Sequence, residues 1–189
     1  IEKDFKAKAG SNYAASRGEF LNGIIMAAYL GFEFVDAAKV IFFDEKGNFD
    51  AEKTNNVLSA RLAECKNAVV PGFYGSLPDG TVKTFSRGGS DITGSIVAKA
   101  IKADVYENWT DVDNVFAVNP NIVKDPFPIF EIAYDEMREL AYAGFSVLHE
   151  EALYPVFVRG IPVHIRNTNN PSAKGTKIVA KRSHYDSLV

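Results

Sequence analysis

Hydrophobic residues recur along the chain in two periods, which predict an alternation of helices and strands. Apolar residues at helical spacing predict helices over 12–30, 51–65 and 92–101, and near 134–143 and 149–159. Short runs rich in β-branched and aromatic residues predict strands at 32–35, 40–43, 68–70, 81–85, 104–107, 163–166 and 176–179. Short buried strands that alternate with helices favour an α/β layered fold with a mainly parallel sheet.

Composition narrows the class of protein. The 189 residues are 47% hydrophobic and 24% charged, enough apolar material for one large domain. A net charge of −3 argues against a nucleic-acid partner. No apolar run reaches the roughly 18 residues of a membrane helix, no signal peptide opens the chain, and the single cysteine, Cys65, excludes an internal disulfide. We therefore expect a soluble cytoplasmic protein without a membrane partner.

The segment 84–91, which reads TFSRGGSD, carries the strongest chemical signal. Gly88 and Gly89 stand where a predicted strand gives way to a helix, and glycine lets the backbone approach a ligand closely. The following helix offers unpaired N–H groups, and Arg87 adds a planar cation beside them. Ser90 and Asp91 lie in the first helical turn. Such a turn can hold a phosphate or a carboxylate.

Other polar residues have both a structural and a functional interpretation. Glu19 is either a solvated helix carboxylate or a ligand for a cation, and Arg87 either a surface ion-pair partner or a carboxylate clamp. Thr110 and Asp111 follow a predicted strand, where α/β sheets bind nucleotides. Phe116 fits the core as well as a nucleotide site.

Two residues after Thr110 and Asp111, and the three histidines of the chain, give no clear indication of a ligand or metal site. Asp113 and Asn114 could equally be turn residues. The three histidines, His149, His164 and His184, are too far apart in sequence to suggest a zinc site, so no protein-held metal is expected.

Several segments in a fixed order resemble the aspartate kinases of the amino-acid kinase family. They are SRGEFL at 16–21, TFSRGGSD at 84–91, WTDVDNVFAVNP at 109–120, YDEMREL at 134–140, GFSVLH at 144–149, IRNT at 165–168 and GT at 175–176. The resemblance covers roughly residues 12–179. It implies a three-layer α/β/α sandwich with a mainly parallel open sheet, incomplete here: a partial catalytic domain at 1–179 and a tail at 180–189 toward a regulatory region.

The resemblance also implies an activity and a set of site residues. The expected reaction is ATP-dependent phosphorylation of the β-carboxylate of L-aspartate to 4-phospho-L-aspartate, the first step toward lysine, threonine and methionine, with Mg²⁺ carried by ATP. Glu19 would contact the substrate amino group, with Ser16 nearby, while Arg87 and Ser90 would hold the same amino acid. Asp91 would orient catalytic lysines. The expected nucleotide-binding residues are Gly88, Gly89, Thr110, Asp111, Phe116, Asn121, Ser146 and Val147. A homodimer is compatible with the resemblance.

Three departures from the family pattern keep alternatives open. Many relatives have a phosphate-binding arginine at the position of Asn121 and a lysine at that of Ser146. No Lys-Phe-Gly-Gly strand, which holds the ATP phosphates in relatives, opens this chain. We therefore expect the isolated chain to be inactive. The alternatives are a non-catalytic domain that binds an amino acid or nucleotide, and a kinase of the same fold that acts on glutamate.

Overall fold

The computed structural model describes residues 1–6, 10–118, 122–142 and 150–182, and these divide into two compact units. The first unit spans Ile1–Ile101 and the second Lys102–Val189. Each unit is described by itself. The predicted single catalytic domain over 1–179 stays a prediction.

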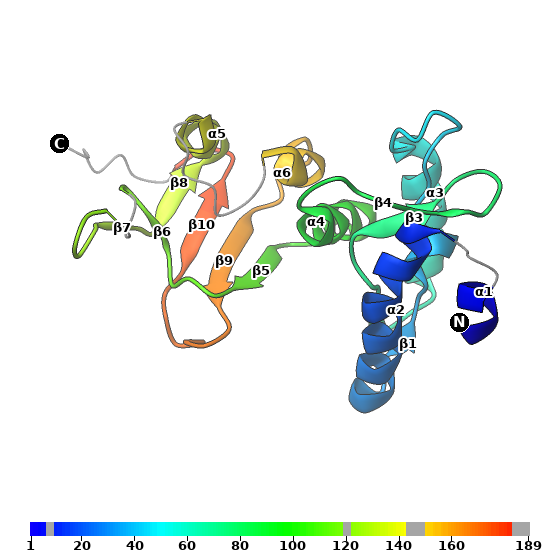
Figure 1. Ribbon diagram of the computed structural model, residues 1–189. Helices are drawn as coiled ribbons and strands as arrows, with labels where there is room; N and C mark the ends of the chain where they lie inside the picture. The colour runs from blue at the N-terminus through cyan, green and yellow to red at the C-terminus, as the bar shows by residue number, and fades with distance from the viewer. Residues whose placement is uncertain (7–9, 119–121, 143–149, 183–189) are drawn as a thin grey trace. The chain divides into compact units, whose positions relative to one another are not determined.

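The first unit combines four helices, a short 3₁₀ helix and two small sheets (Figure 1). Its elements are α1 (Glu2–Lys6), α2 (Ser11–Leu30), β1 (Glu33–Phe34), the 3₁₀ helix η1 (Ala37–Lys39), α3 (Ala51–Ala63), β2 (Ala68–Val69), β3 (Tyr74–Ser76), β4 (Val82–Thr84) and α4 (Gly89–Ile101). β1 and β2 pair in parallel, whereas β3 and β4 form an antiparallel hairpin. The expected strand at 40–43 forms only isolated bridges, from Phe42 to Ser76 and from Phe43 to Phe49.

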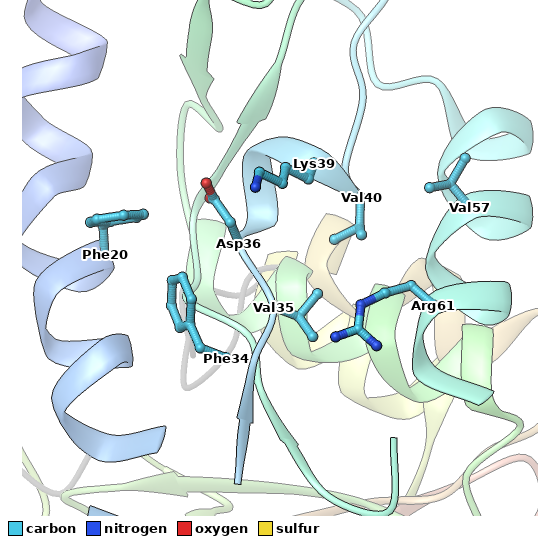
Figure 2. Close-up of a pocket in the computed structure, with 8 residues that line it drawn as sticks. All are labelled: Phe20, Phe34, Val35, Asp36, Lys39, Val40, Val57 and Arg61. Atoms are coloured by element: carbon cyan, nitrogen blue, oxygen red, sulfur yellow. The ribbon is translucent and has the colours of Figure 1, made fainter. Parts of the chain in front are cut away.

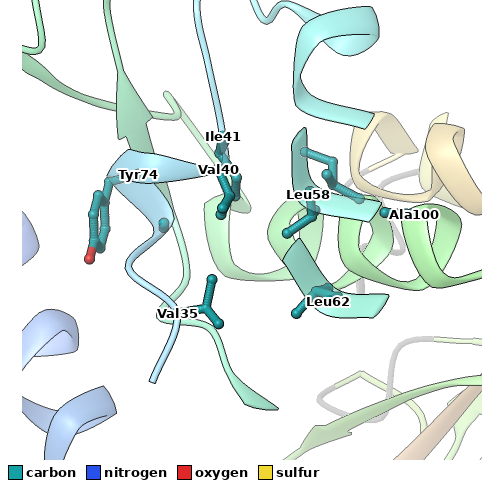
Figure 3. Packing of buried hydrophobic residues seen from close by; sticks show 9 residues of the cluster. Val35, Val40, Ile41, Leu58, Leu62, Tyr74 and Ala100 are labelled. Atoms are coloured by element: carbon teal, nitrogen blue, oxygen red, sulfur yellow. The ribbon is translucent and has the colours of Figure 1, made fainter. Parts of the chain in front are cut away.

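The core of this unit lies between α3, α4 and the β3 region. Figure 3 shows Leu58 and Leu62 of α3 facing Val40, with Ala100 of α4 beside them. Asp50 begins α3 as its N-cap, because its carboxylate accepts a hydrogen bond from the Lys53 N–H. Inside α3, Thr54 is fully buried because its hydroxyl accepts the Phe42 N–H at 2.9 Å. This core fixes the elements that carry the candidate site.

Helix α2 forms where expected, and the face that it buries is not its most apolar one. Its buried residues are small or polar: Ser16, Arg17, Gly23 and Ala27. The apolar residues Ile25 and Tyr29 are 64% and 82% exposed. The close contact explains the choice of face, since a Cβ on Gly23 would lie only 3.1 Å from the Phe34 ring. Hydrophobic spacing thus identified the helix but not its packing side.

The second unit is built on a four-stranded mixed sheet in the order β5-β9-β10-β8, and these strands lie side by side in Figure 1. The β5–β9 and β10–β8 pairs are parallel, and the β10–β9 pair is antiparallel. The elements are β5 (Tyr106–Thr110), β6 (Val115–Phe116), β7 (Pro128–Ile129), β8 (Glu131–Ala133), α5 (Tyr134–Tyr142), α6 (Glu150–Phe157), β9 (Val163–Asn167) and β10 (Thr176–Val179). The described residues between β5 and α5 contain three short strands that the sequence pattern did not predict.

The core of the second unit is aliphatic. Val163, Ile165 and Ile178 are fully buried on β9 and β10, and Val156 of α6 is buried as well. Tyr134 donates its hydroxyl to the Ile161 carbonyl, and burial raises its pKa to about 12. No helix within the described residues is both long enough and apolar enough to span a membrane.

Candidate functional site

The turn between β4 and α4 presents its charged side chains on the surface. Arg87 and Ser90 are exposed, and Asp91 is half-buried in the first turn of α4. Gly88 adopts a φ of 55°, a left-handed conformation that favours glycine, and its carbonyl accepts the Ile92 N–H at 2.9 Å. A cation, a hydroxyl and the amino end of a helix therefore lie together at this turn. Such a group can bind an anion.

The second glycine of the turn is required by packing within the protein. A Cβ on Gly89 would lie 2.5 Å from the Phe73 Cβ and 3.1 Å from the Phe85 Cβ. Thr93 joins the same segments, since its hydroxyl accepts the Phe73 N–H at 3.0 Å and donates to the Gly89 carbonyl at 2.8 Å. The sequence argument explained Gly89 by the close approach of a ligand. In the structure, the space that a Cβ on Gly89 would need is occupied by Phe73.

The segment Ser16–Glu19 of α2 has one exposed and two buried side chains. Glu19 is exposed. Ser16 is fully buried, and its hydroxyl donates to the Tyr13 carbonyl at 2.8 Å and accepts from the Arg17 guanidinium at 2.9 Å. A direct contact between Ser16 and a substrate would require the hydroxyl to leave these partners.

Arg17 is a buried cation that the sequence analysis did not single out. Its side chain is 8% exposed, and its guanidinium carbon lies 4.3 Å from the Tyr13 ring centroid and 4.4 Å from that of Phe20. The Tyr74 ring lies 5.5 Å away on β3. Stacking on aromatic faces stabilises a guanidinium away from water. The sequence signal was weak, because aromatic residues three or four positions from Arg17 look like ordinary core residues.

Helix α2, which carries Glu19, packs against β4, the strand that precedes Arg87. The Thr84 hydroxyl donates to the Asn12 side chain at 2.9 Å. Glu19 therefore lies on a helix packed against the strand that leads to Arg87. Both are exposed and of opposite charge.

The loop after β5 in the second unit is held by side-chain hydrogen bonds. Asp113 accepts the Asn167 side-chain N–H at 2.7 Å, and Asn114 donates to the Gly175 carbonyl at 2.7 Å. The Val115 N–H donates to the Thr176 hydroxyl at 2.8 Å. The turn interpretation of Asp113 and Asn114 thus fits the structure, and Thr176, for which the sequence motif suggested no role, completes the network.

Three predicted nucleotide-binding residues lie along this loop. Thr110 is half-buried, its carbonyl accepts the Thr168 N–H at 2.8 Å, and its hydroxyl donates to the exposed Asp111 at 3.2 Å. Phe116 is half-buried and pairs with Pro128. Asn121, Ser146 and Val147 lie outside the described residues. Their nucleotide-binding role stays a prediction.

A cavity of about 370 Å³ opens in the first unit beside α2 (Figure 2). Its apolar walls are Phe20, Phe34, Val35, Val40 and Val57. Asp36, Lys39 and Arg61 supply the charges. None of the predicted site residues lines it. The part of the chain that the structure describes contains no group of three or more His, Cys, Asp or Glu residues that could hold a metal ion.

Comparison with known proteins identifies the relatives of the chain. The model of the amino acid kinase family matches residues 2–167. Aspartokinase 3 of Bacillus subtilis is 50% identical over 180 residues, which make up 91% of this chain and 40% of that protein. Chloroplastic aspartokinase 1 of Arabidopsis thaliana is 36% identical over 192 residues, covering 94% of this chain and 34% of its own length. The chain thus spans well under half of these relatives.

Solved structures show the same likeness. Clostridium acetobutylicum aspartate kinase superposes with a TM-score of 0.87 at 52% identity, over 96% of this chain and 41% of that one. Escherichia coli aspartokinase III in complex with aspartate and ADP gives a TM-score of 0.83 at 29% identity, over 92% and 41% of the two chains. Uridylate kinase of Archaeoglobus fulgidus, at 19% identity and a TM-score of 0.60, shares the fold alone. The predicted α/β fold with a mainly parallel sheet, and the resemblance to aspartokinases, are confirmed.

Proposed function

Because the chain belongs to the amino acid kinase family, we propose that it is part of an aspartate kinase, which transfers the γ-phosphoryl group of ATP to the β-carboxylate of L-aspartate. The product, 4-phospho-L-aspartate, starts the route to lysine, threonine and methionine. The limited coverage of its relatives supports the view that this chain is part of a longer protein. The observation that carries the proposal is the exposure of Glu19 and Arg87 on adjoining elements of one unit.

L-Aspartate carries one ammonium and two carboxylate groups, and the first unit offers matching charges. Glu19 binds the ammonium group from α2. Arg87 binds a carboxylate through both oxygens, since a guanidinium presents parallel N–H donors. Ser90, exposed in the first turn of α4, adds a hydroxyl to the same amino acid. Removal of either charge would leave its partner group on the substrate unpaired.

Phosphoryl transfer to a carboxylate requires little acid–base chemistry. The aspartate side chain is already ionised at neutral pH, so no general base is needed to activate it. A carboxylate oxygen attacks the γ-phosphorus, the bond from that phosphorus to the bridging oxygen breaks, and ADP leaves with the electron pair. The protein has to position the two substrates and to neutralise negative charge.

The residues at the start of α4 fit this requirement. Gly88 and Gly89 begin a helix whose amino end favours phosphate oxygens, and Asp91 acts there as a positioning residue for cations. Thr110, Asp111 and Phe116 contact the nucleoside, and Asn121, Ser146 and Val147 complete the nucleotide set. ATP brings Mg²⁺ bound mainly through its own phosphates and water.

The test is an acyl-phosphate assay, with hydroxylamine trapping, on the full-length protein from which this chain derives. We expect product with ATP and L-aspartate and far less with L-glutamate. Activity on glutamate alone would defeat the proposal.

Calorimetry distinguishes the proposed kinase from the alternative, a domain that binds its ligands without catalysis. Binding of ATP and aspartate to the full-length protein without phosphotransfer would favour a binding domain, an alternative motivated by the neutral residues at Asn121 and Ser146. For the 189-residue chain alone we predict little or no turnover. Robust turnover by the chain alone would contradict that prediction.

A further inference from the structure

The cavity beside α2 has two unlike parts. Its interior is apolar, with the Phe20 and Phe34 rings edge to face at 5.4 Å between centroids. Charged groups lie at its η1 end, where Figure 2 shows the Asp36 and Lys39 side chains as neighbours. Its volume of about 370 Å³ is at the lower end of the usual range for ligand pockets, roughly 300–1,000 Å³. A small ligand with one charged end and one apolar end fits this shape.

The two charges at the η1 end are held one helical turn apart. Asp36 is the N-cap of η1 and Lys39 is its last residue. Residues three apart on a 3₁₀ helix project from the same side, separated by about 6 Å along the axis. A cation and an anion at this spacing can each bind one end of a zwitterion.

The Asp36 carboxylate is anchored on its protein side. One of its oxygens accepts the Ala38 N–H at 3.1 Å and the Tyr74 hydroxyl at 2.9 Å. Burial raises the pKa of Tyr74, and the negative charge of Asp36 raises it further by a smaller amount. The Tyr74 hydroxyl therefore remains protonated and can donate. Within the described residues neither Asp36 nor Lys39 forms a salt bridge. Both charges therefore stay available to a ligand.

The third charged residue of the cavity is already neutralised. Arg61 donates to Glu33 at 2.7 Å and lies 3.5 Å from Glu64. The hydrogen bond from Arg61 lowers the pKa of Glu33, as expected for an ion pair. The charges left for a ligand are thus one negative and one positive. They suit a ligand with no net charge, and the apolar walls disfavour a second carboxylate such as that of L-aspartate.

We propose that this cavity binds a free α-amino acid with an apolar side chain. Its ammonium group meets Asp36, its carboxylate meets Lys39, and its side chain lies against the Phe20 and Phe34 rings and the neighbouring valines. The site is separate from Glu19 and Arg87, which do not line the cavity. Phe20 follows Glu19 on α2, so a ligand here touches the helix that carries the proposed substrate contact.

Titration calorimetry on the protein, with L-leucine as the probe, tests the proposal. We expect one leucine bound per chain. Isocaproate lacks the ammonium group and isoamylamine lacks the carboxylate, so each should bind roughly tenfold more weakly or worse. Equal affinity for leucine and either analogue would overturn the assignment of charges, and no binding of leucine would overturn the site.

Two variants and a matched control locate the binding. Lys39→Met removes an exposed cation and should weaken leucine binding by roughly tenfold. Val57→Trp should abolish binding by filling the cavity, and thermal denaturation checks that it folds. Lys46→Met removes an exposed cation outside the cavity and should leave the affinity unchanged. Unchanged leucine affinity in both Lys39→Met and Val57→Trp would refute the site.

A competition experiment separates this site from the proposed substrate site. If L-aspartate displaces leucine and Arg87→Ala abolishes both bindings, leucine occupies the substrate site and the cavity proposal is wrong, while the proposed kinase function stands. If leucine binds independently of aspartate but the full-length protein transfers no phosphoryl group to aspartate, the cavity proposal stands and the kinase function fails.

Discussion

The two candidate loops of this chain are held in place by different forces. In the first unit, the turn before α4 is fixed mainly by close packing, with Gly89 against Phe73 and Gly72 against Ser90, and the Thr93 hydroxyl adds hydrogen bonds to Phe73 and Gly89. In the second unit, the loop after β5 is fixed by hydrogen bonds that the Asp113 carboxylate accepts and the Asn114 amide donates. Close packing against a glycine occupies no polar side chain, whereas a loop that is fixed by hydrogen bonds occupies the polar side chains that form them.

The difference determines which side chains each loop can offer to a ligand. The packed turn leaves Arg87 and Ser90 exposed beside the amino end of a helix. The hydrogen-bonded loop uses the amide of Asn114 and the carboxylate of Asp113 for its own structure, and leaves the exposed Asp111 and the half-buried ring of Phe116. The first unit is therefore suited to a charged amino acid, and the second offers a carboxylate and a ring surface.

The steric explanation of the first loop is tested by Gly89→Ala. A Cβ 2.5 Å from the Phe73 Cβ forces the start of α4 to move, which we expect to cost about 3 kcal/mol of unfolding free energy. Urea denaturation monitored by circular dichroism measures the change.

Gly18→Ala provides the matched control on α2. A Cβ there meets no atom within 4 Å, so we expect stability to rise by about 0.5–1 kcal/mol because alanine favours the helix. If Gly89→Ala were as harmless as Gly18→Ala, the turn would not be held by packing.

The exposed charge of the same turn is tested by Arg87→Ala. If the proposed function holds, kcat/KM for aspartate in the full-length protein should fall by roughly 100-fold, about 2.7 kcal/mol, because the proposed bidentate contact with the substrate is lost. Stability should change by less than about 0.5 kcal/mol, since the residue is exposed. Arg87→Lys should not restore activity, because an ammonium group cannot form the paired contact. Steady-state kinetics that show unchanged aspartate dependence would remove Arg87 from the site.

The elements of the fold were largely predictable, because they depend on local periodicity. The last strand, Thr176–Val179, and α3 to within two residues of its end follow directly from the hydrophobic pattern. Strands β3, β6, β7 and β8 were missed, because each has only two or three residues and none lies in a longer run of β-branched and aromatic residues like those that marked β1, β2 and β4. The buried face of α2 could not be predicted from hydrophobicity, because Gly23 and Ala27 are buried for their small size.

The roles predicted for the candidate site residues stay predictions, and the structure adds where each described side chain lies. Glu19 and Arg87 were found through their motifs, and the structure leaves both on the surface. Arg17 was overlooked, although it lies between Ser16 and Gly18, because only the fold brings the Tyr74 ring to the same guanidinium. Thr176 was missed for the same reason: its partners Val115 and Ile129 are distant in sequence.

The hydrogen-bond explanation of the second loop is tested by Asn114→Leu. The buried amide donates to the Gly175 carbonyl, and leucine leaves that carbonyl unpaired, so we expect a loss of about 2 kcal/mol. Asn22→Ala on the exposed side of α2 is the control and should change stability by less than about 0.5 kcal/mol. Amide hydrogen exchange should show faster opening around Val115 in Asn114→Leu only. Unchanged exchange would mean that other contacts hold the loop.

The smallest expected effect concerns Tyr74, a polar group used for structure inside the unit that otherwise relies on packing. Tyr74→Phe removes the hydrogen bond to Asp36 and should cost about 1 kcal/mol at neutral pH. Burial, followed by the Asp36 charge, raises the pKa of Tyr74 above its ordinary value of 10.0.

A group whose pKa is raised on folding stabilises the protein fully below its unfolded pKa and loses that contribution as pH rises above it. The native protein should therefore lose stability above pH 10, by up to about 1.4 kcal/mol per pH unit for this group, whereas Tyr74→Phe should lose less. The two denaturation curves should converge and then cross in alkali. Parallel pH profiles would show that the Tyr74 phenol ionises as freely in the folded protein as in the unfolded chain, and the Tyr74–Asp36 hydrogen bond would then add little to the packing that holds the first unit together.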